Sequence, residues 1–81
     1  MGIREFLKIV REKGALKGKI EDEERWEIGN YLVEINKNGF CVARGKLIIY
    51  AFFFGKEIIS KVPLEKIFQE IQGTETTSSL C

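Results

Sequence analysis

The chain has 81 residues, of which 13 are Lys or Arg, 12 are Asp or Glu and none is His, so its formal charge at pH 7 is +1. This length predicts one small domain that buries about 60 to 65% of the surface exposed by the unfolded chain. The near-neutral balance argues against strong electrostatic attraction to nucleic acid or to an anionic membrane. No apolar run reaches the roughly 18 residues of a membrane span, and no signal-peptide core opens the chain.

The two cysteines, Cys41 and Cys81, form neither a zinc-binding spacing nor a CxxC redox pair. We therefore expect no disulfide framework, no metal and a reducing, cytoplasmic environment. The composition is rich in Lys, Glu and Ile and poor in Asn and Gln, a bias that is typical of proteins from hot environments.

The chain opens with an amphipathic pattern. Ile3, Phe6, Leu7 and Val10 follow the i, i+3, i+4, i+7 spacing, with charged residues between them, which predicts a helix over about 3–13 that ends at Gly14. Residues 15–20 alternate apolar and basic side chains and predict a short edge strand, whose lysines discourage further pairing.

Residues 21–39 fit two structures. As a helix over about 23–37, the segment has an apolar stripe that includes Ile28, Tyr31 and Ile35, and the acidic residues at its start suit a helix N-terminus. As a strand, Tyr31, Val33 and Ile35 share one face, and residues 38–39 form a hairpin turn. We prefer the helix because it accounts for more residues, although Gly29 at its centre costs about 1 kcal/mol relative to alanine.

An uninterrupted apolar run at 47–54 is the centre of the predicted sheet. It is rich in aromatic and β-branched residues and too short for a buried helix, so it predicts a strand that pairs with 40–44 through a turn at 45–46. Periodicity leaves residues 56–62 open between a helical turn and a third strand. Pro63 opens a last amphipathic helix over about 63–72, and the polar residues 74–81 predict a disordered tail.

The predicted fold is therefore α+β, as one domain over 1–73. A small sheet centred on the hairpin 40–54 is packed by helices at about 3–13, 23–37 and 63–72. The alternative is an αβββα plan with a three-stranded antiparallel meander.

The faces of the 47–54 strand give the candidate interaction surface. Strict alternation places Ile48, Tyr50, Phe52 and Phe54 on one side of the strand, and so small a chain has few elements with which to cover both sides. We expect Tyr50, Phe52 and Phe54 to face a partner, with Trp26 as a further anchor.

No arrangement of residues for catalysis is visible: there is no His, nucleophile elbow, P-loop or dinucleotide-binding motif. Cys41 has no activating neighbour in the sequence, and a buried, inert thiol is the expected state. We expect neither an enzyme nor a cofactor site. An RNA-binding sheet needs basic and glycine residues among its aromatics, and the apolar 47–54 run lacks them, so nucleic acid is disfavoured.

Read in order, these pieces resemble the N-terminal domain of the UbiD family of prenylated-flavin-dependent decarboxylases over about 3–72. Arg4-Glu5-Phe6-Leu7 followed by Gly14-Ala15-Leu16-Lys17 is similar to the family's opening helix and Gly-x-Leu step. Glu27-Ile28 looks like the start of the family's next helix, and Phe54-Gly55 resembles its Phe-Gly step.

The resemblance implies a module without an active site, because the family's flavin pocket and catalytic residues lie downstream of the part that this chain resembles. We expect a stand-alone, non-catalytic UbiD-like module that acts as a homodimer or as an accessory subunit of a separate catalytic, decarboxylase-type chain. The first alternative is a small nucleic-acid-binding domain on the αβββα plan, and the second is a ligand-binding domain with an apolar cleft.

Overall fold

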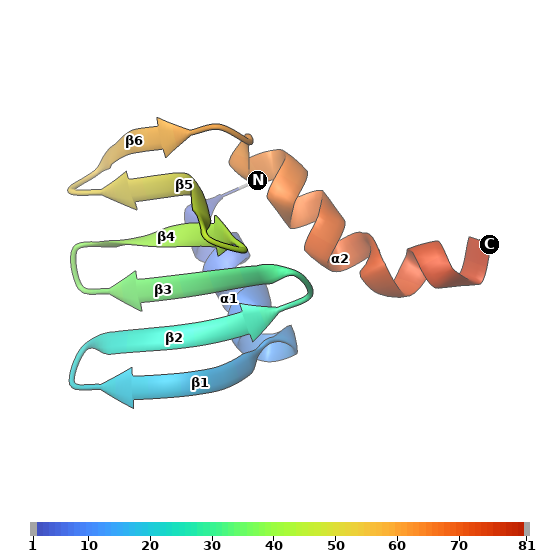
Figure 1. The fold of residues 1–81 in the computed structure, drawn as a ribbon, viewed down its shortest axis with the longest axis horizontal. Helices are drawn as coiled ribbons and strands as arrows, with labels where there is room; N and C mark the ends of the chain where they lie inside the picture. Colours follow the sequence, from blue (N-terminus) through green and yellow to red (C-terminus); the bar gives the residue numbers. More distant parts are fainter. Residues whose placement is uncertain (1, 81) are drawn as a thin grey trace.

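The chain folds as one antiparallel sheet with a helix at each end of the sequence (Figure 1). This computed structural model describes residues 2–80, and the side chains of residues 2–72. The elements are α1 (Ile3–Lys13), β1 (Ala15–Ile20), β2 (Glu23–Ile28), β3 (Tyr31–Asn36), β4 (Gly39–Arg44), β5 (Leu47–Phe53), β6 (Lys56–Ser60) and α2 (Leu64–Leu80). Each strand pairs with the next along the chain, so the six-stranded sheet has the order β1-β2-β3-β4-β5-β6. The α+β class is as expected, but the sheet is larger than either predicted plan.

The helix predicted over 23–37 is wrong, because this segment is the hairpin of β2 and β3. Tyr31, Val33 and Ile35 pair with Arg44, Val42 and Phe40, which is the ladder expected from the strand alternative. Gly29 explains the choice: its φ of +58° makes a tight turn that glycine adopts without steric cost, whereas in a helix the same residue is destabilising.

The boundaries of the other helices and strands agree more closely with those predicted from the sequence. The helix expected at 3–13 is α1, the edge strand expected at 15–20 is β1, and the open segment after residue 55 is a strand, β6. The second helix is longer than the 63–72 expected. The disordered tail expected at 74–81 falls outside the residues whose side chains are described.

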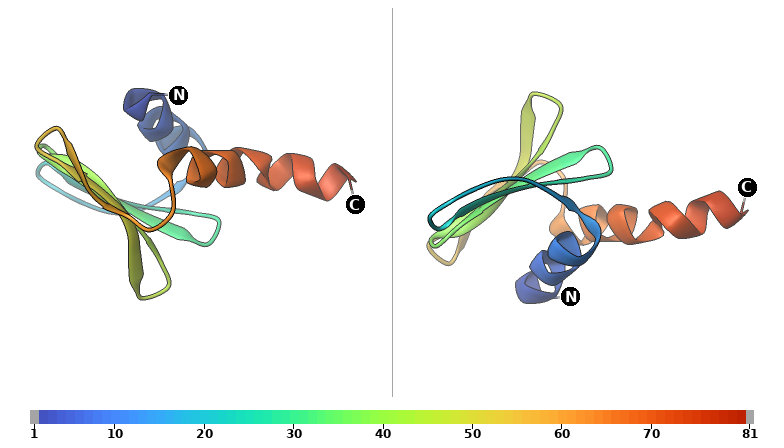
Figure 2. Two further views of the ribbon diagram at one scale, coloured as in Figure 1. Left: turned by 90° about the horizontal axis from the view of Figure 1, so that it is seen from above. Right: turned by 90° about the horizontal axis from the view of Figure 1, so that it is seen from below.

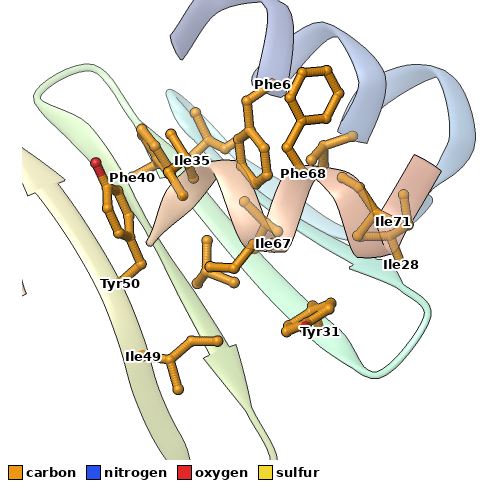
Figure 3. Packing of buried hydrophobic residues seen from close by; sticks show 14 residues of the cluster. Phe6, Ile28, Tyr31, Ile35, Phe40, Ile49, Tyr50, Ile67, Phe68 and Ile71 are labelled. Atoms are coloured by element: carbon orange, nitrogen blue, oxygen red, sulfur yellow. The ribbon is translucent and has the colours of Figure 1, made fainter. Parts of the chain in front are cut away.

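Both helices pack against the same face of the sheet (Figure 2). Phe6 of α1 meets Phe68 of α2, and Ile67 and Ile71 of α2 belong to the same cluster (Figure 3). Val10 of α1 is also buried in this cluster. The sheet supplies the floor of this core through Ile28, Tyr31, Val33, Ile35, Phe40, Val42, Ile49 and Tyr50. The i, i+3, i+4 apolar spacing of each helix is thus used on one side only.

Phe40 is the centre of an aromatic cluster within that core. Its ring stacks on Phe6, Tyr50 and Phe52 at centroid distances of 5.6, 5.8 and 6.1 Å, and Phe68 meets Phe6 edge-on at 6.4 Å. Aromatic pairs at these separations contribute about 0.5 to 1.5 kcal/mol each beyond the area they bury. The cluster joins both helices to β4 and β5.

A β-bulge in β5 changes which side chains join the core. Val42 pairs with Tyr50 while Ala43 pairs with Ile48, so Ile49 is an extra residue on β5. Ile49 and Tyr50 are both buried in the core, which strict alternation does not allow. Ile48 is left on the opposite face with Ala51 and Phe53.

Hydrogen bonds between polar side chains stabilise the edges of the core. Arg11 of α1 donates two hydrogen bonds to the carboxylate of Glu24 at 3.1 Å, and the indole Nε1 of Trp26 donates to the same carboxylate at 2.8 Å. These two donors, Arg11 foremost, hold the pKa of Glu24 below its usual value. The Tyr31 hydroxyl donates to Glu70 of α2 at 2.7 Å, which ties the second helix to β3.

The close approach of β4 to β5 at Gly39 is testable by substitution. A Cβ atom at Gly39 would overlap the carbonyl oxygen of Phe52 and lie 2.8 Å from Cα of Phe53. We expect Gly39→Ala to lower the free energy of unfolding by about 1 to 3 kcal/mol, because rigid backbone must move. Urea denaturation measures this.

Gly18→Ala is the matched control, since a Cβ atom there meets nothing within 4 Å. We expect that variant to equal the wild type or to gain up to about 1 kcal/mol. A Gly39→Ala chain as stable as the wild type would contradict the described packing of the two strands.

Candidate interaction face

The sheet face opposite the helices carries the candidate site, and we call it the open face. Residues that pair across neighbouring strands lie on the same face of the sheet. Along each strand, the residues that alternate with the core residues therefore lie on the open face. Its central members are Arg25 and Glu27 of β2, Leu32 and Glu34 of β3, Cys41 and Ala43 of β4, Ile48, Ala51 and Phe53 of β5, and Ile59 of β6.

One half of the open face is apolar. Leu32, Cys41, Ala43, Ile48, Ala51, Phe53 and Ile59 form adjacent cross-strand positions from β3 to β6. Neither Ile48 nor Phe53 belongs to the core cluster, and Ile48 is 43% exposed. Small residues occupy the middle of this half, at Cys41, Ala43 and Ala51, and larger ones surround them.

The other half of the open face is charged and internally paired. Arg25 contacts Glu34 at 2.9 Å, and Lys17 contacts Glu27 at 3.7 Å. Both pairs are exposed, so each contributes at most about 1 kcal/mol to stability. The two cations and two anions of these pairs cancel, and Glu23, which lies on the same side of β2 as Arg25, adds one negative charge.

A shallow hollow of about 270 Å³ lies between the two halves. Its lining includes Ile20, Arg25, Asn36, Cys41 and Phe53. Burial raises the pKa of the Cys41 thiol, and the carboxylate of Glu34, whose Oε1 accepts a hydrogen bond from Sγ at 3.8 Å, raises it further. A thiol held in its neutral form is a poor nucleophile, so the hollow favours contact rather than covalent chemistry.

The four residues predicted as an interaction surface do not lie together on one exposed face. Tyr50 is 2% exposed, and its hydroxyl donates to Glu57 at 2.8 Å; burial, followed by that carboxylate, raises the pKa of Tyr50 to about 12. Phe52 and Trp26 are half-buried against the core. The aromatic side of β5 is therefore covered by the chain's own helices, and only Phe54 is left exposed.

The alternation of large and small side chains along β4 is the sequence pattern that indicated the open face. Phe40 and Val42 are large, whereas Cys41 and Ala43 between them are small. Such an alternation indicates one face packed in a core and one face of a different kind. Ile48 carried no comparable signal, because its side depends on the bulge at Ile49.

Phe54 has an unusual conformation. It lies in the two-residue turn between β5 and β6 with a φ of +54°, followed by Gly55 at +76°, and its side chain is 76% exposed. Its backbone N–H donates to the carbonyl of Asn38 at 2.9 Å, which joins this turn to the β3–β4 turn. A bulky residue in the left-handed region is an outlier, and such outliers gather at functional sites.

Within the described residues, no group of three or more His, Cys, Asp or Glu side chains could hold a metal ion. In the same part of the chain, neither helix is both long and apolar enough to cross a membrane. Comparison with family models, curated proteins and solved structures found no match to this chain.

The strain at Phe54 predicts a gain of stability when it is replaced. Two-residue turns with two positive φ values favour Asn-Gly. We therefore expect Phe54→Asn to raise the free energy of unfolding by about 1 kcal/mol, by removing the cost of a left-handed aromatic residue. Thermal and urea unfolding measure the gain.

Gly55→Ala is the control for this turn, and it should lose about 1 kcal/mol because alanine disfavours the same region. A Phe54→Asn chain less stable than the wild type would mean that the Phe54 side chain contributes packing to the folded monomer.

Proposed function

We propose that this chain is a non-catalytic module that works by association through its open face. The observation that carries this proposal is the one-sided packing of the helices, which leaves the apolar half of the open face without a helix over it. Within this half Ile48 is 43% exposed, Ala51 is buried, and the other residues are half-buried. Single exposed apolar residues are normal on a protein surface, whereas a contiguous apolar patch marks an interaction site.

The energetics favour a covered open face. Burying a large apolar side chain contributes about 1.5 to 3 kcal/mol. Ile48 and Phe53 lie on opposite sides of Ala51 along β5, and Ile59 lies beside Ala51. A partner that completes the burial of these three side chains recovers part of that energy for each.

The sheet edges support the face as the point of contact. Lys17 is an extra, bulged residue in β1, and Ile58 is an extra, bulged residue in β6. Lys19 and Lys56 add charge to the same two edge strands. Bulges and lysines are the means by which edge strands avoid pairing with another chain. A partner that adds a strand to either edge is therefore disfavoured.

The open face supports association without any reference to a family. The accessory role beside a decarboxylase-type chain, which the UbiD resemblance implies, stays a prediction. One of its ordered pieces, the helix that starts near Glu27-Ile28, is a β-hairpin in this chain.

Nucleic acid is a weaker candidate for the open face. Phe53 is the one aromatic residue among the open-face positions named above, and the cations Lys17 and Arg25 are each held by a carboxylate of the same chain. Single-stranded nucleic acid is bound by several stacking aromatics along a positively charged groove. The paired charges of the open face do not provide one.

Ile48→Lys tests the proposal. The charge replaces an apolar, partly exposed side chain in the association surface, so we expect the native assembly to dissociate. The isolated chain should stay folded but melt at a lower temperature than the assembly, because it loses the stability that association adds. Sedimentation velocity of the tagged chain, purified from the source cell with whatever it binds, measures the loss.

Leu16→Lys is the matched control, because Leu16 has similar exposure, 49%, but pairs with Trp26 on the helix side of the sheet. The control should leave the assembly intact. An assembly that survives Ile48→Lys, or a wild-type chain that is a free monomer in the cell, would refute the proposal.

A further inference from the structure

We infer that Asn38 is a site of spontaneous deamidation and that Asn36 controls the rate of this modification in the folded chain. Asn38 precedes Gly39 in the turn between β3 and β4, and its side chain is exposed to water. Asparagine is a thermolabile residue, and a following glycine has no side chain to hinder attack by its own backbone nitrogen. This modification is independent of the proposed function, because it needs only the turn and water.

The reaction takes place between two adjacent residues. The backbone N–H of Gly39 loses its proton to solvent, and the nitrogen attacks Cγ of Asn38. The bond from Cγ to the side-chain nitrogen breaks, and ammonia leaves with a proton from solvent, which gives a cyclic succinimide. Water then opens the ring at Cγ to give aspartate, or at the backbone carbonyl of Asn38 to give isoaspartate.

The two other asparagines of the chain are internal references for this reaction. Asn30 precedes Tyr31, and Asn36 precedes Lys37. Tyr31 and Lys37 each carry a Cβ atom that crowds the attacking backbone nitrogen, whereas Gly39 does not. Asn30 lies exposed in a turn, as Asn38 does. Exposure alone therefore does not distinguish these two sites, and the residue that follows each asparagine does.

Asn36 restrains the nitrogen that would attack Asn38. Its Oδ1 accepts a hydrogen bond from the N–H of Gly39 at 3.1 Å and another from the N–H of Asn38 at 2.8 Å. A side chain that binds the backbone in this way fixes the conformation of a turn. The Gly39 N–H must leave Asn36 before its proton can pass to water. The folded chain therefore reacts only in the fraction of molecules in which this turn has opened.

Isoaspartate at position 38 would change the backbone where the fold has little room. It adds a methylene group to the main chain immediately before Gly39, where even a Cβ atom would overlap the carbonyl oxygen of Phe52. It also converts the backbone carbonyl of Asn38, which accepts the N–H of Phe54 at 2.9 Å, into a side-group carboxylate. That hydrogen bond joins two turns at the same end of the sheet (Figure 1). The isoaspartate form is therefore less stable than the parent chain.

Incubation of the purified chain in mildly alkaline buffer tests the site. Peptide mass spectrometry and enzymatic methylation of isoaspartate measure the deamidation of each asparagine. We expect Asn38 to deamidate first, and to do so faster in urea, where the turn is open, than in the folded chain. Deamidation that begins at Asn30 or Asn36, or that proceeds equally fast in the folded and unfolded chain, overturns the inference.

Two substitutions of Asn36 test its control of the rate. Asn36→Ala removes the acceptor of both hydrogen bonds, and we expect Asn38 in the folded chain to deamidate about tenfold faster, the factor by which two ordinary hydrogen bonds favour the closed turn. Asn36→Asp keeps an acceptor oxygen and should keep the slow rate. In urea the wild type and both variants should react at similar rates.

The variants are compared at a temperature at which circular dichroism shows each of them to be folded. A folded Asn36→Ala chain that deamidates at Asn38 no faster than the wild type overturns the role of Asn36. An Asn36→Asp chain that deamidates as fast as Asn36→Ala does the same, because the accepting oxygen would then not be the cause.

Discussion

Two amphipathic helices offer one apolar stripe each, and a six-stranded sheet has two faces to cover. In this chain both stripes meet above Phe40, where the rings of Phe6, Tyr50 and Phe52 gather and Phe68 closes the group. A core on one side of the sheet buries the apolar stripes of both helices but only one of the two faces of the sheet. The opposite face therefore has no helix over it.

The bulge at Ile49 links this core to the open face. By adding one residue to β5, it turns Ile49 and Tyr50 together toward the helices and leaves Ile48 with Ala51 and Phe53 on the other side. Without the extra residue, strict alternation would send one of the two buried side chains into water. The same local irregularity thus completes the core and assembles the apolar half of the open face.

The sequence predicted the α+β class, the first helix and the strands around the 47–54 run, because these carry unambiguous periodicity and turn signals. It failed at 23–37, where Ile28, Tyr31 and Ile35 satisfy both a helical stripe and, with Val33, a strand alternation. The neighbouring strand decides such a case: Val42 and Phe40 offer a ladder to β3 that a helix would leave unpaired.

The sequence analysis expected one side of the 47–54 strand to be left uncovered and placed Tyr50 and Phe52 on that side, whereas both side chains lie against the core. Tyr50 and Phe52 are the larger residues, and by the hydrophobic argument alone they need a partner most. The core of the same chain provides the cover for Tyr50 and Phe52. The position of a single-residue bulge depends on the pairing of two strands and has no local sequence signature, so Ile48 could not have been assigned in advance.

Methyl NMR of isoleucine-labelled protein with a soluble paramagnetic agent tests the central claim most directly. In a dilute sample the account predicts strong broadening of the Ile48 and Ile59 methyl signals and little at Ile49 and Ile67. Equal protection of Ile48 and Ile49 in that sample would contradict it, because the chain would then cover both faces of its sheet unaided.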